Sequence, residues 1–128
     1  MVDPRRWLTR RSLIAAMVAV LVLAVGWRFS AYPRGMIAGW GAGLRGHNEI
    51  KVFGLPPPWY GEYTQLIRER YGVEINTLGD VVTRDSVWYA DGYNSVTRQR
   101  IRARFGKDIF AECAQEARTR WELAHPSE

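Results

Sequence analysis

The sequence predicts an α+β protein in which a single N-terminal transmembrane helix precedes a small, mostly helical domain with a two-stranded, βαβ-like element. Three observations predict this class. Residues 13–27 carry no charge, two short alternating segments flank a helical pattern over 58–71, and two further helical patterns follow. A chain of 128 residues leaves room for one small domain beside the apolar segment.

Composition divides the chain into five segments. We expect a basic flank over 1–12, a transmembrane helix or signal anchor over 13–29 and a glycine-rich juxtamembrane linker over 30–47. The α+β domain is expected over 48–125, and residues 126–128 form a tail.

The apolar segment is suited to a bilayer, because in water it would expose apolar surface on every face of a helix. Its fifteen residues, 13–27, are slightly short for a span, and neighbours on both sides extend it. Long or amphipathic side chains at its ends are expected at the membrane interfaces. These residues are Arg10, Arg11, Trp27 and Arg28.

An alternative for this segment is a cleaved secretory signal, with small residues at 24–26 as the cleavage site. The paired Arg10 and Arg11, followed by one residue and two apolar ones, also fit a twin-arginine export signal. The strong hydrophobicity and the terminal Trp27 favour a retained anchor. Either way, we expect the N-terminus inside the inner membrane and the domain outside it, in the periplasm of a bacterial-type envelope.

The net charge of +5 lies beside the apolar segment and not on the domain. Residues 1–43 hold six arginines and one aspartate, whereas residues 44–128 hold twelve basic and twelve acidic side chains. A nucleic-acid-binding domain would carry its basic charge on the folded surface. We therefore expect the lipid bilayer and an unidentified envelope protein as partners, and no nucleic acid.

Glycines dominate the segment after the apolar helix, at positions 35, 39, 41, 43 and 46. Each costs a helix about 0.5–1 kcal/mol relative to alanine, so the segment predicts a flexible linker at the membrane interface. An alternative is that the four-residue spacing of Gly35, Gly39 and Gly43 forms a close-packing surface for a partner helix.

The first part of the domain predicts a strand, a helix and a second strand. Residues 49–53 alternate between polar and apolar and end at a glycine-proline segment. The helix is expected from Pro58 to Tyr71, with Gly72 after its last turn. Residues 73–76 then form a strand parallel to the first. Two strands alone are marginally stable, so other helices must cover them.

Two more helices are expected after this unit. The first runs over 84–105, with Thr83 or Asp85 as its N-cap and a kink or boundary near Gly92. Gly106 is a plausible cap, and the second helix runs over 107–123.

Polar and aromatic residues alternate most densely over 88–95, and they predict a polar pocket rimmed by aromatic rings. The expected binding residues are Trp88, Asp91, Tyr93, Asn94 and Ser95. A structural alternative is that Asp91 and Asn94, on or near the core face, satisfy each other, the 77–83 turn or a helix end. One carboxylate without a partner base specifies no reaction, so no catalytic residue is predicted.

No metal ion or cofactor is predicted. His47 and His125 lie far from metal-ligand spacing, and the common nucleophile, phosphate and zinc motifs are absent. The single Cys113 excludes an intrachain disulfide and is expected as a small buried hydrophobe. Arginines at 98, 100, 102 and 104 are expected on a solvated face, with anionic lipid or an acidic partner as the alternative.

These observations predict a single-pass membrane protein whose domain acts by binding and not by catalysis. The domain is rich in aromatic residues, some of which we expect to form an exposed interaction patch. They are Trp59, Tyr60, Tyr63, Tyr71, Trp88, Tyr89 and Tyr93. The alternative function is a small exported hydrolase or ligand-binding protein that uses a polar site around Asp91, with release by signal cleavage as a further alternative.

Overall fold

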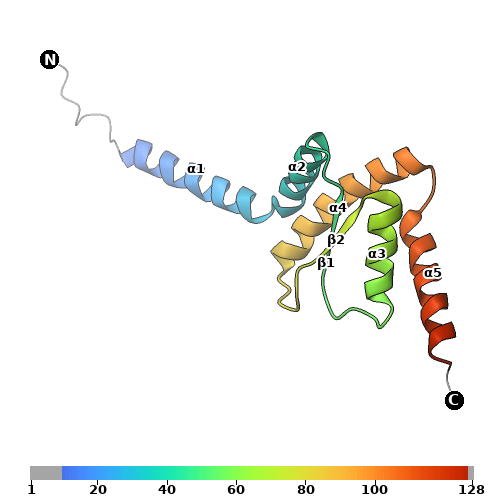
Figure 1. Cartoon of the computed structure of the whole chain (residues 1–128). Coiled ribbons are helices and arrows are strands. Elements are labelled where there is room, and N and C mark those ends of the chain that lie inside the picture. The colour runs from blue at the N-terminus through green and yellow to red at the C-terminus, as the bar shows by residue number, and fades with distance from the viewer. Residues whose placement is uncertain (1–9, 127–128) are drawn as a thin grey trace.

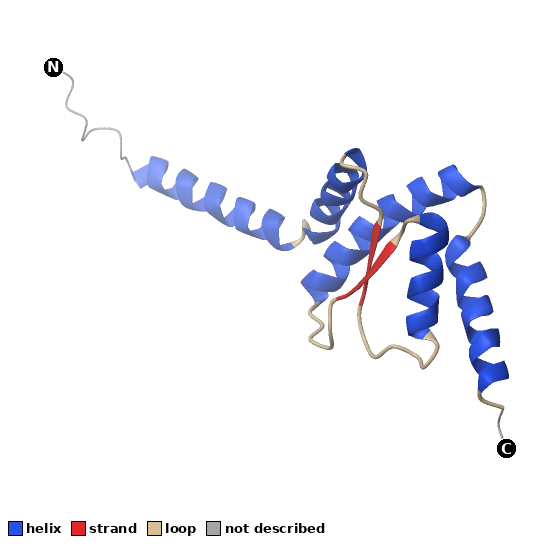
Figure 2. Cartoon of the chain, viewed as in Figure 1, coloured by secondary structure: helices blue, strands red, loops and turns tan. Residues whose placement is uncertain are grey.

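The computed structural model describes residues 10–126, which form five helices and one two-stranded sheet (Figures 1 and 2). In chain order the elements are α1 (Arg10–Arg28), α2 (Ala31–Leu44), β1 (Glu49–Val52), α3 (Tyr60–Tyr71), β2 (Glu74–Thr77), α4 (Arg84–Phe105) and α5 (Ile109–Ala124). The predicted helical domain with a small parallel sheet is therefore confirmed.

Helix α1 projects from the globule as a separate rod (Figure 1). Its 19 residues include none that is buried. At 1.5 Å per residue it is about 28 Å long, close to the thickness of a bilayer's hydrocarbon core. By length and composition it qualifies as a membrane span, and an N-terminal signal sequence would qualify equally. Of the predicted basic flank over 1–12, residues 1–9 lie outside the described part of the chain.

The strand–helix–strand unit has the predicted parallel pairing. β1 and β2 lie side by side with Ile50 opposite Ile75, and α3 connects them. Gly72 ends α3 with a φ of 65° and donates its N–H to the Arg68 carbonyl. Only a residue that tolerates this left-handed conformation fits there at low cost, which explains why the sequence pattern located the helix end.

The core lies where α3, α4 and α5 meet the sheet. Its buried side chains are Ile50, Leu66, Ile67, Val73, Ile101, Ile109, Cys113 and Ala117. Burial raises the pKa of the Cys113 thiol, which favours the protonated, unreactive form. The predicted structural role of this cysteine agrees with its position.

Helix α4 is continuous, so the predicted boundary between two shorter helices near Gly92 is wrong. Gly92 is buried against the backbone of Tyr32 in α2, and its lack of a side chain serves that contact. Of the two predicted N-caps, Thr83 is the one used. Its hydroxyl accepts a bond from the Ser86 N–H at 3.1 Å, and the Ser86 hydroxyl accepts one from the Thr83 N–H at 3.0 Å.

The predicted flexible linker over 30–47 is also wrong, because most of this segment is the helix α2. Its inner face, Ala31, Gly35, Gly39 and Ala42, is buried. A Cβ at Gly35 would overlap the Tyr89 carbonyl oxygen, and one at Gly39 would lie 2.9 Å from the Tyr93 carbonyl oxygen. The close-packing alternative is therefore the one that the structure adopts, and the partner helix is α4 of the same chain.

Candidate functional site at the junction of α1, α2 and α4

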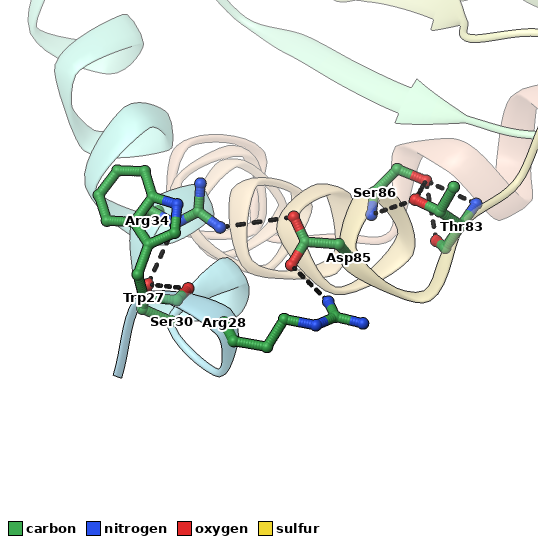
Figure 3. Close-up of polar contacts among 7 residues, drawn as sticks. All are labelled: Trp27, Arg28, Ser30, Arg34, Thr83, Asp85 and Ser86. Carbon is green, nitrogen blue, oxygen red and sulfur yellow. Dashed lines mark hydrogen bonds and ion pairs between the residues drawn. The ribbon is translucent and has the colours of Figure 1, made fainter. Parts of the chain in front are cut away.

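The apolar helix meets the globule at a junction built by Arg28, Arg34 and Asp85 (Figure 3). Arg28 lies in the last turn of α1, Arg34 in the first turn of α2, and Asp85 in the first turn of α4. The Arg28 Nη1 atom is 3.5 Å from Asp85 Oδ1, and the Arg34 Nη2 atom is 3.4 Å from Asp85 Oδ2. One carboxylate thus joins three helices.

The start of α4 sets the position of this carboxylate. The capping box of Thr83 and Ser86 fixes the first turn of the helix, and Asp85 lies inside it (Figure 3). A negative charge at a helix N-terminus is favourable, since the free backbone N–H groups there carry partial positive charge. The Asp85 side chain is 41% exposed, so its ion pairs orient the helices and add at most about 1 kcal/mol each.

Arg34 also binds the last turn of α1. Its Nε donates a hydrogen bond to the Ser30 hydroxyl at 3.1 Å, and the Ser30 hydroxyl donates one to the Trp27 carbonyl at 2.8 Å. The Arg34 guanidinium lies 4.3 Å from the centre of the Trp27 ring, a cation–π contact. The bend between α1 and α2 is therefore held by side chains on both sides of it.

Arg100 fixes the other end of α2. It donates hydrogen bonds to the Gly39 carbonyl, the His47 carbonyl and Asn48 Oδ1, each at 3.2 Å. The expectation of a solvated face is therefore wrong for Arg100, whereas Arg98, Arg102 and Arg104 are exposed. Arg100 thus donates to a carbonyl within α2 and to two groups of the turn that follows it, so it joins α4 to both.

The five predicted binding residues lie on different sides of α4. Tyr93 is buried, while Asn94 and Ser95 are half-buried and Trp88 is exposed. Asp91 is exposed as well, so its expected position on or near the core face is wrong. A ligand site at these residues stays a prediction.

Asn94 has a structural partner that differs from the expected ones. Its Oδ1 accepts a bond from the Lys51 N–H at 2.8 Å, and its Nδ2 donates one to the Lys51 carbonyl at 2.7 Å. The amide thus pairs with the backbone of β1 as a neighbouring strand would. Ser95 donates to the Gly92 carbonyl at 2.8 Å within its own helix.

The predicted membrane-interface residues occupy the two ends of α1. Arg10 and Arg11 begin the helix, and Trp27 and Arg28 end it, and all four are exposed. The sequence contains no signal for the ion pairs of Asp85 in the junction, because they link residues 51 and 57 positions apart. The local contacts of Ser30 with Trp27 and Arg34 were not predicted either. The glycine spacing was the one signal of the α2–α4 contact.

The exposed aromatic residues differ from the predicted patch. Among the seven predicted residues, Trp88 is exposed and the others are buried or half-buried. Trp59 packs edge-on against Tyr63, and Tyr71 packs edge-on against Phe105. Exposed aromatic side chains instead occur at the end of α1, in the turn that follows it and on α2, at Trp27, Phe29, Tyr32 and Trp40.

Within residues 10–126, no group of three His, Cys, Asp or Glu side chains is placed to hold a metal ion. Comparison of the chain with models of protein families, with curated proteins and with solved structures finds no match. The junction and the surfaces beside it are therefore the features that suggest a function.

Proposed function

We propose that α1 is a retained single-pass anchor in the inner membrane of a bacterial-type envelope, with the N-terminus inside and the α+β domain in the periplasm. The observation that supports this most is that α1 buries no residue against the globule although it is almost wholly apolar. In water, its exposed Leu, Ile, Val and Met side chains would be unfavourable over the whole length of the rod. A bilayer removes that cost.

At the junction, the last turn of α1 is fixed to the folded domain. Trp27 and Arg28 both belong to α1 and both contact residues of the folded domain, through Arg34 and Asp85. Both residues follow the alternative cleavage site at 24–26, and retention is favoured by the strong hydrophobicity of the helix that precedes them. The junction gives α1 a defined direction relative to the domain, which is a property useful to a permanent anchor.

We further propose that the domain acts as a protein-interaction or accessory module. Exposed apolar side chains on two loops support this role, because such side chains are common at binding surfaces. Leu55 follows β1, while Val81 and Val82 lie between β2 and α4. The Gly54 N–H donates to the Gly79 carbonyl at 3.4 Å, so the two loops lie together.

Membrane fractionation tests the anchor. The full chain, carrying a C-terminal epitope tag, should stay in the membrane pellet after washes with sodium carbonate and with high salt. A Val18→Arg/Leu21→Arg variant places two charges in the middle of α1, at about 2.5–3.5 kcal/mol each, and should leave the pellet. Leu123→Arg, on an exposed apolar residue of α5, is the matched control and should stay.

The same cells test orientation and binding. Protease added to spheroplasts should digest the domain, while intact cells protect it. Crosslinking on those spheroplasts should join the domain to an envelope protein, and Leu55→Asp/Val81→Asp should reduce that product more than Leu123→Asp does. Wild-type chain recovered in the carbonate supernatant, or recovered without residues 1–26, would contradict the anchor.

A further inference from the structure

We propose that the outer face of α2 lies in the lipid headgroup region, so that the domain is seated on the bilayer. The outer face consists of Pro33, Ile37, Trp40 and Leu44. This inference rests on the proposed function, since it needs α1 in the membrane, and it adds a second lipid-contacting surface that belongs to the folded domain.

The outer face is apolar and unpartnered within the described chain. Its members are spaced by four, three and four residues, which places them on one side of a helix, opposite the buried inner face. The exposed fractions are 64% for Ile37, 54% for Trp40 and 91% for Leu44. None of the four carries a charge. A helix with one face packed on protein and the other uniformly apolar needs a second apolar environment.

The connection to α1 brings α2 to the membrane surface. Only Phe29 and Ser30 separate the two helices, and two residues span at most about 7 Å. The ion pairs of Asp85 and the contacts of Arg34 hold the two helix ends together as well. The first turn of α2 therefore cannot move away from the level at which α1 leaves the bilayer.

The direction of α2 places one side of this helix, and not its end, toward the level at which α1 leaves the bilayer. Figure 1 shows that α2 turns away from the line of α1 instead of continuing it. The inner face is fixed on α4, where the backbones of Gly35, Gly39 and Gly92 touch the facing helix. Since the inner face cannot rotate outward without breaking these contacts, the outer face is the one that remains available to lipid.

The aromatic residues agree with this placement. Exposed rings occur at Trp27 and Phe29 beside the end of α1, and at Tyr32 and Trp40 on α2. Trp and Tyr are enriched at the level of lipid headgroups, because their rings are apolar and their tips form hydrogen bonds. Arg45, directly after α2, adds a cation near anionic headgroups.

Site-directed spin labelling of the full chain tests the inference. The chain is reconstituted in vesicles of phosphatidylcholine and phosphatidylglycerol at a three-to-one ratio, with single variants Ile37→Cys, Trp40→Cys and Leu44→Cys. Leu123→Cys, 78% exposed at the far end of α5, is the matched aqueous control for Leu44→Cys. Leu21→Cys reports on α1. Cys113 is left in place because it is buried. The wild-type chain, treated with the same spin label, measures any background labelling at Cys113.

The measured quantity is the ratio of oxygen to nickel-chelate collisions at each label. Labels on the outer face should show a ratio about threefold or more above that at position 123, as expected for side chains 5–10 Å below the headgroup surface. The label at position 21 should give a higher ratio still.

The failures of the two proposals are distinguishable. Labels on α2 that match position 123, with a lipid-like label at position 21, would overturn the seating of α2 alone. A water-like label at position 21 would overturn the anchor itself. Labels on α2 that are shielded from both reagents and broadened by spins in neighbouring copies would show that a second copy covers the face, which also overturns the inference.

Discussion

Asn94 takes the place of a neighbouring strand at one edge of β1. Its Oδ1 accepts a hydrogen bond from the Lys51 N–H at 2.8 Å, and its Nδ2 donates one to the Lys51 carbonyl at 2.7 Å. Both backbone polar groups of Lys51 are therefore paired. Arg100 has a similar part at the end of α2, where it binds two carbonyl groups and Asn48. Both residues belong to α4, so polar side chains of this one helix hold β1 and the end of α2 against it through hydrogen bonds.

Replacement of Asn94 by Ala should lower the free energy of unfolding by about 1–3 kcal/mol, because it leaves a half-buried N–H and C=O of β1 unpaired. Ser95→Ala is the matched control on the next residue. It removes a bond within the helix and should change stability by no more than about 0.5 kcal/mol. Thermal unfolding of the full chain in detergent, followed by circular dichroism, measures both. Equal stability of Asn94→Ala and wild type would contradict the structural role.

At the scale of elements, the packing of α2 on α4 decides the architecture of the part of the domain that follows α1. Glycine disfavours a helix in isolation, but at Gly35, Gly39 and Gly92 it lets two backbones approach until carbonyl groups contact the facing helix. The residues that predicted a flexible linker are therefore the ones that make a rigid contact possible. Such a contact transmits the direction of α1 to the rest of the domain.

Two glycines of α2 should respond in opposite directions to substitution by alanine. Gly35→Ala forces a methyl group into the Tyr89 carbonyl and should destabilise the chain by about 1–3 kcal/mol. A Cβ at Gly41 meets nothing within 4 Å, so Gly41→Ala should stabilise by up to about 1 kcal/mol through helix propensity. The melting temperature of the full chain in detergent measures both. A stabilised Gly35→Ala variant would contradict the close packing.

At the scale of the whole molecule, ion pairs tie α5 to the rest of the domain. Glu116 binds Arg70 of α3 and Arg120 of its own helix, while Glu112 binds Lys107 and the Tyr71 hydroxyl. Hydrogen bonds from Arg70 lower the pKa of Glu116, and those from Lys107 and Tyr71 lower the pKa of Glu112. A carboxylate whose pKa is lower in the folded state stabilises that state above its unfolded pKa of 4.5.

The stability of the domain should therefore fall as the pH drops below 4.5 and both carboxylates take up protons in the folded state. Unfolding by urea, measured across this range in detergent, should show a shallower pH dependence for Glu112→Gln/Glu116→Gln than for the wild-type chain. Glu122→Gln, which alters an ion pair within α5 alone, is the control. Equal slopes for the double variant and the wild type would contradict the assignment.

Local patterns in the sequence were enough to determine the apolar rod, the parallel strand–helix–strand unit, the C-terminal end of α3 and both ends of α4, because glycines, caps and apolar periodicity act on the backbone within a few residues. The start of α3 was predicted at Pro58, whereas the helix begins at Tyr60. The helical state of α2, the partner of Asn94 and the joining of three helices by Asp85 were decided by the tertiary structure. Each depends on groups that lie tens of residues away in the chain, such as the Tyr89 carbonyl opposite Gly35. From the sequence alone, a glycine indicates only that the backbone is conformationally free at that position. Whether it lies in a flexible segment or in a closely packed helix depends on the element that packs against it.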